Sequence, residues 1–122
     1  MGLTYKIDVE AGVILTFGEG EINAADIREV RARFTADPLY NPKFHSLFDG
    51  RAAEISFGGE EARNMALWAK RNRPAAKMAF VIAPQSQGFL RMYTAWGGEN
   101  QQLFHDLAAT REGLGLPSED NS

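Results

Sequence analysis

The chain of 122 residues contains no cysteine, which excludes disulfides, thiolate catalysis, Cys-ligated zinc and iron–sulfur clusters. A domain without such cross-links is held together by the packing of its core, which fits a reducing compartment. No apolar run approaches the roughly 20 residues that a membrane-spanning helix needs, since the longest, residues 78–83, has the length of a buried strand. The N-terminal residues show no apolar segment behind a basic start, and we therefore expect a cytoplasmic protein without a transmembrane segment.

The chain also has little excess charge of either sign, since its net charge is only −3. A nucleic-acid-binding domain more often shows a clustered positive field, so we expect no nucleic-acid partner. The one basic cluster of the sequence consists of Lys70, Arg71, Arg73 and Lys77. It begins where a helix is expected to end, and cations there complement the helix dipole. A phosphate-binding role for this cluster is the alternative.

Catalytic motifs are missing as well. The two histidines, His45 and His105, have Ser46, Asp49 and Asp106 nearby in sequence, but no Gly-x-Ser-x-Gly motif occurs to present a nucleophile. The histidines also lack the close spacing to further ligands that zinc sites show. We therefore predict no catalytic, cofactor-binding or metal-binding residues.

What the sequence does contain is the composition of an ordinary globular domain, with 44% hydrophobic residues. Apolar and polar residues alternate over residues 5–9, as in a half-buried strand. We expect further strands at residues 13–17, which are apolar on both faces as in a central strand, and at 44–48, 78–83 and 102–105. Helices are expected between Asn23 and Pro38, from Glu60 to about Arg71, from Ser86 to Gly97, and from Asp106 through Leu114. Asn23 and Asp26 have the spacing of a capping box, and the segment 52–59 is expected to be irregular.

The resulting order is ββαβαβαβα. Strands that alternate with helices predict βαβ crossovers, and hence a mostly parallel sheet with helices on both faces. The opening pair of strands predicts an antiparallel hairpin at or near an edge of the sheet.

Three segments show a likeness to a known family. They are Leu47-Phe48-Asp49 at a strand end, the strand 79–83 leading into Gly88–Tyr93, and Phe104-His105-Asp106 followed by Leu114-Gly115-Leu116. With the order of elements, they resemble the SpoIIAA-like family of small bacterial domains, which is related to STAS domains and grouped with the SEC14-like lipid-binding fold. The resemblance implies one α/β domain over residues 1–117, with a five-stranded, mixed, mostly parallel sheet, four helices and a flexible acidic tail at 118–122. Many members of the family have no assigned activity.

The resemblance also implies a function through protein–protein contact. Better-studied STAS relatives bind a partner protein and are switched by phosphorylation of a serine at the start of the second helix. The corresponding surface here consists of Ser56, Gly58, Gly59, Glu60 and Glu61. The acidic residue and the paired serine of the phosphorylated turn are missing, so Ser56 is interpreted as a turn or cap residue. We expect a non-enzymatic binding or regulatory module whose partner is another protein or a second copy of the chain.

The expected third helix suggests a second surface. Phe89, Met92, Tyr93 and Trp96 follow the spacing of one helix face, which predicts core packing or, together with Trp68, a groove for a ligand or a dimer partner. The alternative function is therefore a carrier or sensor of a small apolar ligand, as the likeness to SEC14-like proteins implies.

Overall fold

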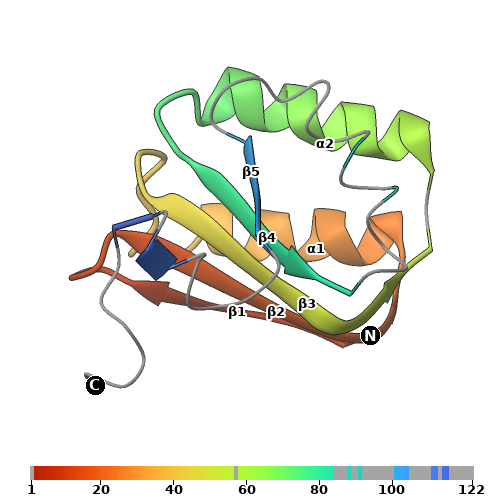
Figure 1. Cartoon of the computed structure of the whole chain (residues 1–122). Coiled ribbons are helices and arrows are strands. Elements are labelled where there is room, and N and C mark those ends of the chain that lie inside the picture. Colours follow the sequence, from red (N-terminus) through yellow and green to blue (C-terminus); the bar gives the residue numbers. More distant parts are fainter. Residues whose placement is uncertain are drawn as a thin grey trace.

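The computed structural model describes residues 2–56 and 58–83, positions 88 and 91, the backbone of 101–104, and residues 111–112 and 114–115. In these parts of the chain the strands are β1 (Leu3–Asp8), β2 (Val13–Ile22), β3 (His45–Ile55), β4 (Met78–Ile82) and β5 (Gln101–Phe104). The helices are α1 (Ala24–Thr35) and α2 (Gly59–Asn72) (Figure 1). Residues 118–122, the expected tail, lie outside the described residues.

The strands form one mixed sheet in the order β1-β2-β3-β4-β5. β1 pairs with β2 in antiparallel orientation, and every later pair is parallel. The predicted α/β class, with its hairpin at the edge of a mostly parallel sheet, is confirmed. Gly12 permits the hairpin turn, because its φ of 67° lies in a region that side chains with a Cβ avoid.

Two strands are longer than predicted. The sequence Gly18-Glu19-Gly20 does not end β2, because the strand absorbs it with a register shift between Phe17 and Glu19. Asp49-Gly50 does not end β3 either, since the strand continues to Ile55 through the segment that was expected to be irregular. In both places a glycine fits a bulge or a close approach within the sheet, rather than a turn.

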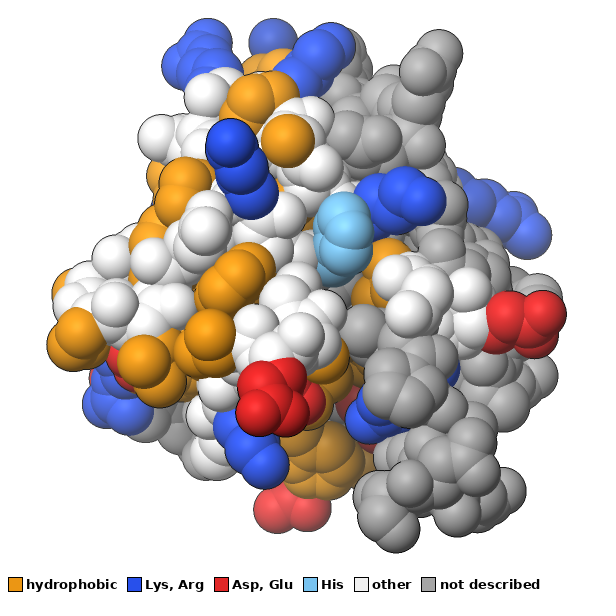
Figure 2. Space-filling model, turned by 90° about the vertical axis from the view of Figure 1, so that its left-hand side faces the viewer, with side chains coloured by type: hydrophobic (Ala, Val, Ile, Leu, Met, Phe, Trp, Pro, Cys, Tyr) orange, Lys and Arg blue, Asp and Glu red, His pale blue; other side chains and the backbone are white. Residues whose placement is uncertain are grey.

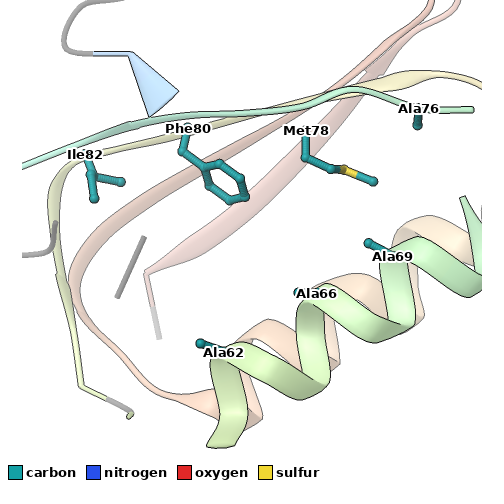
Figure 3. Close-up of a cluster of buried hydrophobic side chains, with 7 residues drawn as sticks. All are labelled: Ala62, Ala66, Ala69, Ala76, Met78, Phe80 and Ile82. Carbon is teal, nitrogen blue, oxygen red and sulfur yellow. The ribbon is translucent and has the colours of Figure 1, made fainter. Parts of the chain in front are cut away.

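Helices α1 and α2 lie side by side on the same face of the sheet (Figures 1 and 3). The prediction placed helices on both faces, but the other two expected helices fall almost wholly on residues outside those that the structure describes. α1 begins at the predicted capping box, in which the Asn23 side chain accepts from the Asp26 backbone N–H and the Asp26 carboxylate accepts from the Asn23 N–H.

The core has a cluster on each face of the sheet. On the helix-covered face, Met78, Phe80 and Ile82 of β4 point toward α2 (Figure 3). α2 meets them with three alanines, Ala62, Ala66 and Ala69. On the opposite face, Val13, Leu47, Ala79 and Leu114 form the second cluster. On this face small residues of α2 pack against large residues of β4.

The capping box makes a testable contribution to stability. Replacing Asn23 with Ala removes an acceptor from the first turn of α1, and we expect it to lower the free energy of unfolding by about 1 kcal/mol. Asn64→Ala, at an exposed position within α2, is the matched control and should be neutral or slightly stabilising. Urea unfolding of the two variants measures the difference, and equal effects would contradict the capping role.

Candidate functional site

A cavity of about 110 Å³ lies between the sheet and the two helices. It is lined by residues of α1, α2, β2, β3 and β4. Most of the lining is apolar and includes Ile27, Phe34, Phe48, Met65, Trp68, Met78 and Phe80. The polar lining consists of Thr16, Arg31, Ser46 and Arg73. A concave, largely apolar surface with a few polar groups is typical of small-molecule sites.

The cavity exists because the helices do not fill the space over the middle of the sheet. Thr16, Ser46 and Phe48 lie on β2 and β3, on the face that the helices cover, yet all three are only half-buried. The alanines of α2 pack against β4, but they are too short to cover the neighbouring strands. The half-buried lining residues of the helices, which include Met65 and Trp68, place the opening of the cavity between α1 and α2.

Two contacts join α1 and α2, one of them in the cavity wall. The guanidinium carbon of Arg31 on α1 lies 4.5 Å from the ring centroid of Trp68 on α2, a cation–π distance. Nearer the N-termini of the helices, Arg28 donates to Glu61 at 3.2 Å. That ion pair is exposed and contributes little to stability, whereas the Arg31–Trp68 contact forms part of the cavity wall.

Arg73 lies at the inner end of the cavity and is only 3% exposed. It is the C-cap residue of α2. Its guanidinium donates to the hydroxyl of Ser46 at 2.6 Å and to the carbonyl oxygen of Phe44. The same group approaches the sulfur of Met78 at 3.7 Å. A single side chain thereby joins the end of α2 to the beginnings of β3 and β4.

Aromatic rings surround the same guanidinium. Its central carbon lies 5.8 Å from the ring centroid of Phe34 and 6.0 Å from that of Tyr40. Tyr5 of β1 packs edge-on against Phe34, and its hydroxyl donates to Asp37 at 2.8 Å. Arg73 therefore lies at the centre of an aromatic cluster that connects the edge strand, α1 and the loop before β3.

Basic side chains lie at the edge of the sheet where β3 and β4 begin. Figure 2 shows Lys and Arg side chains above and beside a histidine on this face. Nδ1 of His45 accepts from the backbone N–H of Lys77 at 2.9 Å. Partial burial lowers the pKa of His45 below its usual 6.5, and the charges of Lys77 and Arg73 lower it further. His45 is therefore held in its neutral form as a hydrogen-bond acceptor.

The predicted contact surface lies at the opposite edge of the sheet, where β2 and β3 end. Ser56, Gly58 and Glu60 are exposed, and Gly59 and Glu61 are half-exposed. The backbone N–H and the hydroxyl of Ser56 both donate to the carbonyl oxygen of Ile22. Ser56 does not cap α2, because Gly58 occupies the N-cap position. The structure thus brings these residues together, with Ser56 bound to the end of β2.

Of the predicted groove, only Trp68 falls within the described residues, where it lines the cavity. Phe89, Met92, Tyr93 and Trp96 lie outside them, as does His105. Sequence reasoning missed the cavity role of Arg31 and Arg73, and it assigned Arg73 to the helix dipole together with Lys70 and Arg71. A charged residue that follows a helix is normally expected to be solvent-exposed. No pattern in the sequence indicates that Arg73 is buried.

His45, Ser46 and Asp49 do not form a catalytic arrangement. Strand alternation places Ser46 on the opposite face of β3 from His45 and Asp49. Asp49 instead forms a two-point contact with Arg51, whose hydrogen bonds hold the Asp49 pKa below its usual value. Among the residues that the structure describes, no group of three or more His, Asp or Glu side chains is placed to hold a metal ion.

A comparison of the chain with models of known protein families finds no match, and a comparison with curated proteins also finds none. Within the described part of the chain, no helix has the length and apolar character needed to cross a membrane.

Arg73 makes a testable contribution to stability. Arg73→Ala removes hydrogen bonds to Ser46 and Phe44 and leaves a buried space, so we expect it to lower the free energy of unfolding by about 2 to 4 kcal/mol. Arg71→Ala removes the same charge from the neighbouring exposed position and should change stability by less than about 0.5 kcal/mol. Chemical denaturation compares the two, and similar losses would show that Arg73 is not an anchor.

The lowered pKa of His45 predicts a pH dependence. Because the unfolded chain binds this proton more readily than the folded chain, the native state loses stability as the pH falls through 6.5 toward the folded pKa. His45→Asn offers an acceptor to the Lys77 N–H without titrating, so its stability relative to the unmodified chain should rise as the pH falls.

The measurement is the free energy of unfolding between about pH 5.5 and 8, on either side of the usual histidine pKa. Lys77→Met should make the dependence of the unmodified chain shallower, because it removes a charge that lowers the His45 pKa. Lys43→Met, at an exposed position of the preceding loop, is the control. Parallel pH curves for His45→Asn and the unmodified chain would refute the assignment.

Proposed function

We propose that the chain is a binding domain that holds a small apolar molecule in the cavity between the sheet and the two helices. The observation that carries this proposal is the exposure of Thr16, Ser46 and Phe48 to unfilled space in the middle of the helix-covered face. A side chain that points from a central strand toward a helix layer is normally covered, and a void there forfeits packing contacts.

The size of the cavity indicates the size of the ligand. A buried apolar cavity of about 150 Å³ binds one benzene molecule in a well-studied case, and the cavity here has about 110 Å³ and an opening toward solvent. The described residues therefore favour a ligand about as large as one aromatic ring. Such a ligand is smaller than the lipids that the SEC14-like resemblance implies. Of the two ligand classes expected for a carrier or sensor, a small apolar molecule or a lipid, the cavity therefore favours the small apolar molecule.

The aromatic and sulfur-containing lining suits such a ligand. Phe48 and Phe80 lie with ring centroids 6.3 Å apart in a tilted arrangement, and an aromatic ligand gains from edge-to-face contacts with rings of this kind. Met65 and Met78 adjust their side chains to different shapes because they are unbranched. These contacts are specific for ring-like apolar groups without requiring one particular molecule.

A contact function of the SpoIIAA-like type is a second proposal. It is supported by the exposure of Ser56, Gly58 and Glu60 next to one another where β3 passes into α2. Glu60 and Glu61 in the first turn of the helix make this surface acidic, which favours a partner with a basic surface. Phosphorylation of Ser56 would have to break its hydrogen bond to Ile22.

Binding of toluene tests the first proposal. We expect the ¹³C-methyl NMR signals of Met65 and Met78 to shift on addition of toluene, with a dissociation constant of about 1 mM or lower, as suits seven heavy atoms. Ile27→Phe adds a ring to the cavity wall and should weaken binding at least about fivefold.

The control is Leu39→Phe, which enlarges a side chain that is 54% exposed and outside the cavity. It should leave toluene binding unchanged. Absence of methyl shifts in the unmodified chain, or equal weakening by the two variants, would exclude the cavity as the binding site.

A further inference from the structure

Two hydroxyl groups line the cavity from neighbouring strands. Thr16 lies on β2 and Ser46 on β3, and both residues are half-buried. Ser46 pairs with Met78 of β4, which points toward α2 in Figure 3, so the Ser46 side chain lies on the same, helix-covered face. Thr16 pairs with Phe48, which is two residues beyond Ser46. The two hydroxyl groups are therefore diagonal neighbours on one face of the sheet.

Neither hydroxyl group donates its hydrogen to another described residue. The Ser46 hydroxyl accepts from the guanidinium group of Arg73 at 2.6 Å, and it makes no other hydrogen bond within the described part of the chain. The Thr16 hydroxyl has no hydrogen-bond partner among the described residues. A hydroxyl group carries one donor and two acceptor sites. Each of the two groups therefore keeps its donor for a molecule in the cavity.

The contact with Arg73 makes the Ser46 hydroxyl a strong donor. A hydroxyl group that accepts a hydrogen bond from a cation is polarised, and its own O–H then donates more strongly. Arg73 is only 3% exposed, so water screens this polarisation little. The cationic group thus acts on the cavity through the hydroxyl group that it binds.

A pure hydrocarbon does not satisfy these groups. When a ligand fills the cavity it excludes water from the two hydroxyl groups, and a polar group that is cut off from water without a partner costs free energy. A ligand that displaces water loses affinity unless it reproduces the hydrogen bonds of that water. A carbonyl oxygen reproduces them, because its two lone pairs can accept from both hydroxyl groups.

We propose that the ligand is a ring-sized apolar molecule with one carbonyl oxygen, which accepts hydrogen bonds from Ser46 and Thr16. This rests on the proposed function and adds the chemical class of the ligand. The ring lies against Phe48, Phe80 and Met65, which line the same cavity. The apolar wall supplies most of the contact, and the hydroxyl groups fix the orientation of the molecule.

A matched pair of probes separates the carbonyl group from the ring. Cyclohexanone and methylenecyclohexane have the same ring and the same number of heavy atoms, and they differ only in a C=O or a C=CH₂ group. Both should shift the methyl NMR signals of Met65 and Met78. The carbonyl carbon of bound ¹³C-labelled cyclohexanone should resonate at higher frequency than in a hydrocarbon solvent, because hydrogen bonding polarises the C=O bond.

Thr16→Val provides the sharpest variant, because valine keeps the branched shape of threonine and lacks its hydroxyl group. It should weaken cyclohexanone binding about fivefold and change methylenecyclohexane binding less than about twofold, as the loss of one hydrogen bond implies. Thr4→Val is the matched control, since it makes the same change at an exposed position of β1 outside this cavity. It should leave both affinities unchanged.

Ser46→Ala removes the second donor. It also removes an acceptor of Arg73, so any change in the shape or stability of the site affects both probes. The ratio of the two dissociation constants isolates the carbonyl contact. We expect Ser46→Ala to shift this ratio against cyclohexanone by at least as much as Thr16→Val does, because it removes the stronger donor.

The outcomes distinguish the two proposals. Binding of toluene and methylenecyclohexane, with equal effects of Thr16→Val on both cyclohexyl probes, overturns the carbonyl proposal and leaves the proposed function in place. A bound carbonyl signal at its position in a hydrocarbon solvent also overturns it, because no hydroxyl group would then donate to the oxygen. Failure of all three probes to shift the signals of Met65 and Met78 overturns both proposals.

Discussion

The buried guanidinium group of Arg73 links the end of α2 to the sheet and to α1. α2 packs on β4 through alanines, which bury little area, so the attachment at its C-terminal end adds to the contacts that position it. Arg73 provides this attachment through Ser46, the Phe44 carbonyl group and the rings of Phe34 and Tyr40. Burying a charge is unfavourable unless it is well surrounded by polar and aromatic partners. The same residue thus anchors the fold and lines the cavity.

The cavity follows from the distribution of large and small side chains. The alanines of α2 pack against β4, while Met65 and Trp68 on the same helix line the cavity. Unfilled space costs roughly 24 cal/mol per Å³ in a buried core, so about 110 Å³ corresponds to at most roughly 3 kcal/mol. A domain that carries such a cost without a bound molecule is stabilised when a suitable ligand fills the space.

The sequence was sufficient for the features that depend on local chemistry. Asn23 and Asp26 define the start of α1, and the alternation of strands and helices predicts the parallel sheet. The longer reach of β3 was missed because Asp49-Gly50 resembles a turn. In the structure Asp49 binds Arg51, and Gly50 lies beneath the ring of Phe48, where a Cβ would come within 2.4 Å of the ring. The burial of Arg73 was missed because its partners lie 27 and 29 residues away. The cavity depends on side chains from five elements, and no local pattern reports their joint packing.

The unfilled space beneath the helices also makes the stability of the fold sensitive to pressure. Unfolding eliminates internal voids, and the volume of the protein–water system then decreases. Hydrostatic pressure therefore favours the unfolded chain. A molecule that occupies the cavity removes part of this volume change. The same empty volume therefore affects both the sensitivity of the fold to pressure and the occupancy of the site.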